Sequence, residues 1–374
     1  MRTQAENLTK AYIHLDHLTH NIGLLQSLAG KRPLWPAIKA NAYGHGLTIV
    51  ARHLLGLGYD TLCLAHVSEV LELIEAGIRA RYLLLSATLP EHCEAIVQLG
   101  CEPVLCNREL LDTLGHTAQR LEKPVAVHLM IDTGMGRIGI RPEEAPAMLE
   151  SCRAFPYLKV RGLMSHFPCA DQTDKTFSRQ QTARFKQVIE ATRCYQIPFC
   201  HMANSAAILD LPESHFDAAR PGIALYGLRP SAEIVNPRVD ELKPVLSWKS
   251  RINFLKEVPA GTGLSYGHIF HTCRPSLIAT LPVGYGDGLS RNLSNRCEML
   301  VRGLRCPQVG RITMDQTLID VTALRGRVEL GDEVVIIGRQ GQEEISADEL
   351  ADKLGTINYE IVTAISKRVP RLVA

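Results

Sequence analysis

Short apolar segments alternate with longer amphipathic ones from residue 11 to about residue 230. Eight of the apolar segments have the length of strands: Leu34–Lys39, Thr61–Ala65, Tyr82–Ser86, Glu102–Leu105, Val125–Ile131, Val160–Ser165, Phe199–Ala203 and Ile223–Tyr226. Helical periodicity follows most of them: Leu47–Leu57, Ser68–Ala76, Glu91–Leu99, Arg108–Gly115, Pro142–Cys152, Asp174–Tyr195 and Ser205–Leu209. This repeated alternation predicts a (β/α)8 barrel, with an open doubly wound sheet as the alternative.

The pattern changes at about Pro244. Gly, Pro and Asn turns then separate β-like runs at Val245–Val258, Leu277–Pro282, Glu298–Val301, Gln308–Arg311, Gln316–Val321 and Glu333–Ile337. Helical periodicity returns at Ser346–Leu354, where Ser346 and Glu349 fit a capping box. We therefore predict an α/β protein with an N-terminal barrel over residues 1–240 and a C-terminal mainly β domain over residues 241–374.

Composition argues against several kinds of partner and site. The chain has 374 residues, 41 Lys and Arg against 39 Asp and Glu, and a net charge of +2, which argues against a nucleic-acid partner. The first ten residues lack the apolar core of a signal peptide, and no apolar run approaches the ~20 residues that cross a bilayer. Eleven scattered cysteines indicate free thiols and a cytoplasmic protein. The histidines have no matching Cys or carboxylate set, so no metal site is predicted.

Lys39 lies at the end of the first apolar segment, and the turn-forming residues Asn41, Gly44 and Gly46 follow it. The end of a buried strand is a costly place for a cation, and parallel α/β proteins build their sites at that edge. A side chain that reaches solvent is the alternative interpretation of Lys39. A desolvated lysine has a lowered pKa, and its neutral amine can form a Schiff base.

The ends of the later predicted strands carry polar and mainly cationic residues. In chain order these are Asp132, Arg137, Ser165, His166, His201, Asn204, Ser205 and Arg220. Ser205 at a helix N-terminus and the backbone amides of Gly222 and Ile223 are donors suited to a phosphate. A Schiff-base lysine beside a phosphate site indicates either a pyridoxal-phosphate enzyme or a sugar-phosphate aldolase.

The chain resembles the alanine racemases, which are fold-type III pyridoxal-phosphate enzymes. The resemblance rests on motifs in order across both predicted domains: Ala37–Gly46, Asp132–Arg137, Met164–Phe167, Ala203–Ala206, Ala219–Gly222, Gly263–Gly267, Val283–Gly288, Met314–Gln316 and Ile357–Glu360. It implies an enzyme that interconverts L-alanine and D-alanine and supplies D-alanine for peptidoglycan. It also implies pyridoxal 5'-phosphate as the cofactor and a homodimer that shares its active sites.

The resemblance also implies roles for single residues. Lys39 would hold the cofactor and move the α-proton on one face of the substrate, and Tyr266 of the partner subunit would act on the opposite face. The residues implied to bind the cofactor are Tyr43, His166, Ser205, Arg220, Gly222, Ile223 and Tyr359. Arg137 and Met314 would engage the substrate carboxylate, and Arg220 would contact the pyridine nitrogen.

Chemistry supports two acid/base groups, because one group that returns its own proton mostly restores the starting enantiomer. A phenolate at Tyr266 needs a nearby cation or hydrogen-bond donor, and His166 backed by Arg220 is the predicted pair. The always-charged guanidinium of Arg220 does not donate a full proton to the ring nitrogen, which makes the ring a weaker electron sink. The alternatives are a serine or broader-specificity racemase, an amino-acid decarboxylase and a non-catalytic pyridoxal-phosphate carrier.

Met130 departs from the pattern of the family. Many members carry at this position a carbamylated lysine that pairs with the arginine matching Arg137. Methionine cannot carry a carbamate, so Arg137 is expected either to find another anion, a bound chloride or a carboxylate, or to be less well fixed.

Overall fold

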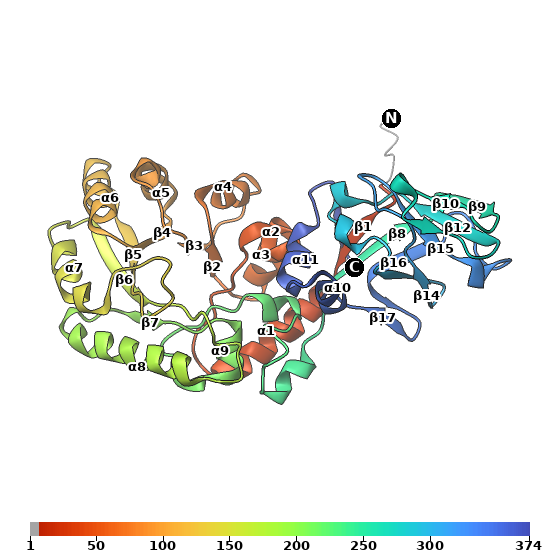
Figure 1. Cartoon of the computed structure of the whole chain (residues 1–374). Coiled ribbons are helices and arrows are strands. Elements are labelled where there is room, and N and C mark those ends of the chain that lie inside the picture. The colour runs from red at the N-terminus through yellow and green to blue at the C-terminus, as the bar shows by residue number, and fades with distance from the viewer. Residues whose placement is uncertain (1–6) are drawn as a thin grey trace. The chain divides into compact units, whose positions relative to one another are not determined.

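The computed structural model of the chain describes residues 7–374 (Figure 1). The chain divides into two compact units. The barrel unit contains Leu18–Ala42 and Leu47–Lys243, and the β unit contains residues 7–17, Tyr43–Gly46 and Pro244–Ala374. The short segment Tyr43–Gly46 therefore leaves the barrel unit directly after Lys39 and its turn, and Leu47 returns to it.

The barrel unit is built on a parallel sheet of six strands in chain order. They are β2 (Thr61–Leu64), β3 (Arg81–Leu84), β4 (Glu102–Leu105), β5 (Val125–Met130), β6 (Leu158–Met164) and β7 (Phe199–His201). The helices are α1 (Leu15–Ala29), α2 (Lys39–Tyr43), α3 (Leu47–Gly56), α4 (Val67–Glu75), α5 (Cys93–Leu99), α6 (Arg108–Arg120), α7 (Ala145–Cys152), α8 (Thr176–Ala191) and α9 (Ser205–Asp210). Helices α4 to α8 lie outside the strands (Figure 1).

Isolated parallel pairings close this sheet into a ring. His201 at the end of β7 pairs with Ala218, and the neighbouring Ala219 pairs with Leu34. Ala37 in turn pairs with Cys63 of β2. The predicted (β/α)8 barrel is therefore confirmed, with residues 34–37 and 218–219 in the first and eighth strand positions.

The strand predicted at Ile223–Tyr226 is wrong, because these residues form the 3₁₀ helix η5. The backbone N–H groups of Gly222 and Ala224 both donate to Ser205 Oγ, at 2.8 Å and 3.2 Å, in place of a strand ladder. A short, fully buried apolar run does not distinguish a strand from a helical turn by its pattern. The eighth strand position lies just upstream, at residues 218–219.

The first predicted strand is also less regular than expected. Within Leu34–Lys39 only Leu34 and Ala37 make strand pairings, and Lys39 is already the first residue of α2. Pro36 has no N–H to donate, although its carbonyl still accepts from the N–H of Cys63 at 2.8 Å. Lys39 therefore lies two residues after the last pairing, near the end of the strand position but outside the strand.

The β unit contains a seven-stranded sheet, a three-stranded sheet and a two-stranded ribbon. Its strands are β1 (Lys10–Ile13), β8 (Leu246–Arg251), β9 (Phe254–Val258), β10 (Gly263–Leu264), β11 (Phe270–His271), β12 (Ser276–Leu281), β13 (Glu298–Val301), β14 (Leu304–Pro307), β15 (Thr317–Asp320), β16 (Glu333–Gln340), β17 (Glu343–Ile345) and β18 (Arg371–Val373). Helices α10 (Ala347–Leu354) and α11 (Asn358–Ala364) follow β17.

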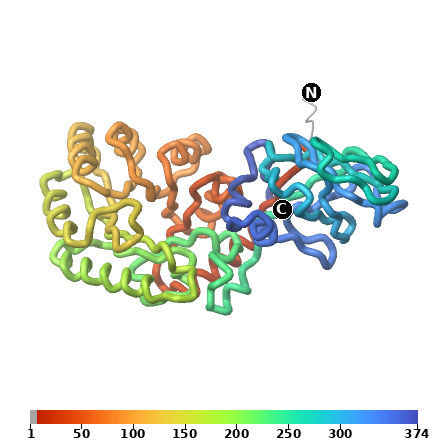
Figure 2. Tube along the Cα trace, viewed as in Figure 1, coloured from red at the N-terminus to blue at the C-terminus, as the bar shows by residue number. Residues whose placement is uncertain are grey.

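Strand β1 joins the two ends of the chain in the β unit. It pairs antiparallel with β8 and parallel with β18, so Ala11 lies opposite both Trp248 and Arg371. The red N-terminal strand therefore lies among segments coloured green to blue (Figure 2). The hydrophobic pattern did not predict this pairing, because partners so far apart leave no local signal.

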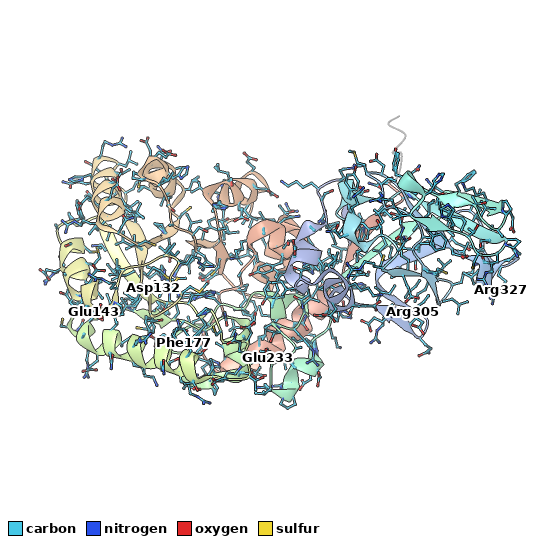
Figure 3. The ribbon with its side chains drawn as sticks, in the orientation of Figure 1. Asp132, Glu143, Phe177, Glu233, Arg305 and Arg327 are labelled. Atoms are coloured by element: carbon cyan, nitrogen blue, oxygen red, sulfur yellow. The ribbon has the colours of Figure 1, made fainter. Side chains whose placement is uncertain are left out.

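Most of the predicted β runs are strands, but the run predicted at Gln308–Arg311 is wrong. The strand is β14, which ends at Pro307, and Gln308 makes only one isolated pairing with Ile319. Arg305 on β14 (Figure 3) forms ion pairs with Glu298, Glu343 and Glu349 at 3.2, 2.8 and 3.0 Å. This arginine ties β13, β17 and α10 together. Ser346 caps α10 by accepting the N–H of Glu349 at 3.0 Å, the first half of the predicted capping box, whereas the Glu349 carboxylate pairs with Arg305 and Lys353.

Candidate functional site

A pocket of about 220 Å³ lies where the strands of the barrel unit end. Its charged or titratable lining residues are Lys39, Arg137, His166 and Arg220. Its other lining residues are Leu85, Ser86, Ala87, Met130, Ile138 and Met164. Each basic residue follows the end of a different strand position, which explains why residues far apart in the chain meet here. A pocket with basic groups and no carboxylate in its lining is suited to an anionic ligand.

Lys39 opens a left-handed turn. Ala40, Asn41, Ala42 and Tyr43 all have φ between 52° and 55°, a conformation that costs L-residues about 1–2 kcal/mol each. Three hydrogen bonds to Glu69 of α4 surround the turn: its carboxylate accepts the N–H groups of Ala40 (2.6 Å), Ala65 (2.7 Å) and His66 (3.1 Å). Asn41 accepts the N–H of Leu47 at 2.8 Å and so links the turn to α3.

We expect Glu69→Ala to destabilise the folded protein by about 2 kcal/mol, because it removes a charged acceptor from three backbone donors around a strained turn. Unfolding in urea, followed by circular dichroism, measures the change. Glu72→Ala on the exposed face of the same helix is the control and should have little effect. Equal effects of the two substitutions would contradict the role of Glu69.

Two effects lower the pKa of Lys39. Burial comes first, and the nearby positive charge of Arg137 adds to it. Glu69 opposes them by raising the pKa, but the net direction is downward. A larger fraction of Lys39 is therefore a neutral amine at neutral pH than for an exposed lysine.

Arg220 is 3% exposed, and burial lowers its pKa to about 10, so it remains a cation at neutral pH. It donates to the backbone oxygens of Ser165 at 2.7 Å and Met202 at 3.2 Å. Its Nη2 also lies 3.5 Å from Nδ1 of His166. Because a guanidinium only donates, that His166 nitrogen accepts, and the ring carries its proton on Nε2.

His166 is a neutral side chain. Burial and then the positive charges of Arg220, Arg137 and Lys39 lower its pKa to about 3. Of the two ways in which His166 was expected to assist a phenolate, the structure therefore favours a neutral hydrogen-bond donor. The positive charge belongs to Arg220.

Ser205 lies at the start of α9, next to the residues expected to bind a phosphate. Asn204 caps that helix by accepting the N–H of Ala207 at 3.0 Å. Ser205 Oγ accepts from Gly222, so the structure brings Ser205, Gly222 and Ile223 together at the N-terminus of η5. In the β unit the rings of Tyr43 and Tyr359 lie 6.2 Å apart.

The loop after β5 presents Arg137 to the pocket. Asp132 holds this loop, because its carboxylate accepts the N–H groups of Gly134 at 2.9 Å and Gly136 at 3.1 Å (Figure 3). Met130 packs in an apolar cluster with Val104 and Met164. Within residues 7–374, Arg137 forms no ion pair, so a bound chloride and a carboxylate both stay predictions for Arg137.

Tyr266 and Met314 belong to the β unit and are 74% and 52% exposed. Tyr266 is held by its backbone: Arg311 donates to the Tyr266 carbonyl at 3.2 Å, and Ser265 donates to the Arg311 carbonyl at 2.7 Å. The carbonyl of Met314 accepts the N–H of Gly286 at 2.9 Å, next to Tyr285. The β unit thus exposes the side chains of Tyr266 and Met314 from a backbone held by hydrogen bonds.

Sequence reasoning missed Glu69, Glu102 and His128. Glu69 lies in the amphipathic helix α4, where its charge resembles that of any solvated face. Glu102 and His128 lie in the buried strands β4 and β5 and bond to each other at 2.9 Å. A charged or titratable residue inside a predicted buried strand is the signal that could have identified this pair.

Across residues 7–374, no group of three or more His, Cys, Asp or Glu side chains is arranged to hold a metal ion. Over the same residues, every helix is too short or too polar to cross a membrane. The eleven cysteines are all free thiols.

Comparison with known proteins gives one consistent family. Family models described as alanine racemase, N-terminal domain, and alanine racemase, C-terminal domain, match residues 13–230 and 245–373. The chain is 45% identical to the alanine racemase of Halothermothrix orenii, over 97% of this chain and 96% of that protein. It is 43% identical to that of Carboxydothermus hydrogenoformans, over 97% and 98%.

Solved structures agree. The alanine racemase of Clostridium difficile 630 superposes with a TM-score of 0.94 at 34% identity, over 99% of this chain and 97% of that one. The Bacillus anthracis alanine racemase with bound L-Ala-P gives a TM-score of 0.92 at 36% identity, over 99% and 95%.

Proposed function

We propose a mechanism from one premise: this chain belongs to the alanine racemase family. Its activity is the interconversion of L-alanine and D-alanine. The relatives and structures named above are alanine racemases, and this chain matches nearly their whole length. The decarboxylase and carrier alternatives therefore have no support. The observation that carries the mechanism is a lysine with a lowered pKa in a pocket whose other ionisable residues are basic.

The pocket fits pyridoxal 5'-phosphate. Its basic lining suits the anionic phosphate and substrate carboxylate, and the Lys39 amine suits the aldehyde. Arg220 would contact the ring nitrogen, and Ser205, Gly222 and Ile223 would hold the phosphate; Tyr43, Tyr359 and His166 would complete the site. When bound, the cofactor supplies an electron-withdrawing ring that makes the α-proton of alanine more acidic.

Two groups move the proton. Lys39 acts at Cα on one face of the substrate, because its lowered pKa favours the neutral base. Tyr266 acts at Cα on the other face, which allows the proton to return on the opposite side. Arg137 and the main chain near Met314 bind the substrate carboxylate and hold Cα between the two bases.

We infer a homodimer in which Tyr266 acts in the site of the partner subunit. The support is the exposure of Tyr266 (74%) and Met314 (52%), together with Tyr285 (43%) and Ile269 (41%) of the same unit. Large exposed side chains of this kind are what an interface between subunits would cover. The inference also follows the arrangement that the family resemblance implies.

Arg137 is expected to need a small anion. Because Met130 is apolar and Arg137 has no ion pair within residues 7–374, replacing chloride by a bulky anion such as glutamate should raise KM for alanine about two- to tenfold. Steady-state assays at constant ionic strength measure it. A high-resolution map that shows Arg137 held by a protein carboxylate alone would rule out the anion.

The direct test of the proposed mechanism is reaction with L-alanine in deuterated water in the presence of pyridoxal phosphate. D-Alanine that carries deuterium at Cα is the expected product. Release of carbon dioxide, or exchange without inversion, would sink the proposal.

We further infer that the protein works in the cytoplasm and supplies D-alanine for peptidoglycan. The support for the compartment is the set of eleven free cysteines, since such thiols are typical of a reducing environment. Fractionation of the native cell, followed by immunoblotting, tests the location. Deletion of the gene for this chain tests the supply role. Growth should stop, and only added D-alanine should restore it.

A further inference from the structure

A buried chain of hydrogen bonds crosses the barrel interior and ends at the pocket. Nη1 of Arg220 bonds to Nδ1 of His201. Nε2 of His201 lies 2.8 Å from Nδ1 of His128, and Nε2 of His128 lies 2.9 Å from Oε2 of Glu102. His128 and Glu102 side chains are 1% and 8% exposed, so solvent has almost no access to these bonds. We call these four residues the Glu102–Arg220 chain.

Every proton in this chain has one consistent position. The guanidinium of Arg220 only donates, so His201 must accept on Nδ1 and carry its proton on Nε2. His201 then donates to Nδ1 of His128, which leaves the His128 proton on Nε2, pointed at Glu102. The carboxylate accepts it. Burial lowers the pKa of both histidines, which agrees with two neutral rings.

The barrel makes room for this chain with one glycine. A Cβ at Gly162 of β6 would lie 2.3 Å from Nδ1 of His128 and 3.1 Å from Nε2 of His201. The backbone of Gly162 is not left-handed, so the glycine is needed here for space and not for conformation. Trp35 packs edge-on against His201 and His128, with ring centroids 4.7 Å and 5.7 Å away. Such apolar surroundings strengthen each hydrogen bond.

Glu102 anchors the far end of the chain. It is the first residue of β4, at the N-terminal ends of the strands, whereas Arg220 follows the last pairing at their C-terminal ends. Arg81 and Arg161 approach its carboxylate at 3.4 Å and 3.5 Å. The chain therefore links a carboxylate with two arginine neighbours at one end of the barrel to the pocket cation at the other.

The geometry points to Glu102 as a positioning residue that acts through His128 and His201 on Arg220. By accepting the last proton, Glu102 holds His201 as an acceptor that faces Arg220. One edge of the guanidinium is thereby fixed, and its orientation toward the pocket is set. This inference rests on the proposed function where it concerns catalysis, because Arg220 is the residue expected to contact the cofactor.

Histidine ¹⁵N NMR of the full-length protein tests the chain without any reaction. In the natural sequence, His128 and His201 should both be neutral with the proton on Nε2. Glu102→Leu, which removes the acceptor, and Gly162→Ala, which crowds the two rings, should each shift the ¹⁵N signals of both histidines. The buried His215, which bonds to the Ala207 carbonyl at 3.1 Å, is the internal control and should not move. A charged His201, or a proton on its Nδ1, would overturn the inference.

The loaded enzyme provides the second readout. Glu102→Gln keeps an acceptor but removes the charge, so we expect kcat to fall about threefold to tenfold, with KM for alanine nearly unchanged; Glu102→Leu should lower kcat about 10²-fold. The absorbance spectrum of the bound cofactor should change with both. Glu349→Gln, which removes a carboxylate paired with Arg305 in the β unit, is the matched control.

Normal kcat and spectrum in Glu102→Leu would overturn the role of Glu102, even if the variant is less stable. Failure of the natural sequence to racemise alanine would overturn the mechanism instead. The NMR result stands apart from that outcome, so the two failures are distinguishable.

Discussion

Replacing Lys39 with alanine is expected to lower the rate of racemisation by at least about 10⁴-fold. In the proposed mechanism this change removes both the amine that holds the cofactor and one of the two bases. Formation of D-alanine from L-alanine, measured by chiral chromatography, gives the rate. The absorbance of the cofactor, once free ligand is removed by gel filtration, shows whether the covalent attachment is lost as well.

Lys39→Arg separates charge from chemistry. Arginine keeps a cation in the pocket but remains protonated and forms no Schiff base. It should therefore be nearly as inactive as alanine, with less effect on stability. If either variant racemises within tenfold of the natural sequence, Lys39 is not the base.

The pocket geometry explains why the effect should be so large. Burial and the charge of Arg137 lower the pKa of Lys39, which favours its neutral amine. The other basic groups of the lining are not amines and cannot substitute for it. Arg220 and Arg137 carry guanidinium groups, and His166 is neutral but bonded to Arg220. In the proposed mechanism each of these side chains binds or orients, and none replaces the proton transfer by Lys39.

Replacing Tyr266 with phenylalanine is expected to lower racemisation about 10²- to 10⁴-fold while the cofactor stays attached to Lys39. The phenol is lost, but the backbone bonds that hold residue 266 involve only its carbonyl and should persist. In deuterated water, one enantiomer should still exchange its α-proton at the Lys39 face without inversion. Tyr12→Phe in β1 is the control for loss of a phenol and should leave the rate unchanged.

Mixing the two inactive variants tests where Tyr266 acts. In a mixed dimer of Lys39→Ala and Tyr266→Phe chains, one of the two sites combines an intact Lys39 with an intact Tyr266 from the partner subunit. An equal mixture should therefore recover about a quarter of the activity, since half of the dimers are mixed and half of their sites are complete. No recovery after exchange of subunits would contradict a shared site.

Local patterns predicted much of the barrel. The strand-length apolar segment Glu102–Leu105 was correct, because side-chain burial along a strand or helix leaves a periodic record in the chain. Met130 was identified as a departure from its motif alone, and the structure places it in an apolar cluster. The prediction at Ile223–Tyr226 was wrong because all four residues are buried, so no alternation of apolar and polar positions distinguishes a strand from a helical turn.

The sequence by itself determined which residues lie at or just beyond the ends of the strands, since each follows its strand within one short segment of the chain. Only the tertiary structure decided how they are held. Glu69 reaches Ala40 across 29 positions, Glu102 reaches His128 across 26, and His128 reaches His201 across 73. Periodicity reports whether a residue is buried, but a hydrogen bond depends on a partner from another strand or helix. That partner is set by the closure of the barrel, so the hydrogen bonds of Glu69, Glu102 and His128 are seen only in the fold.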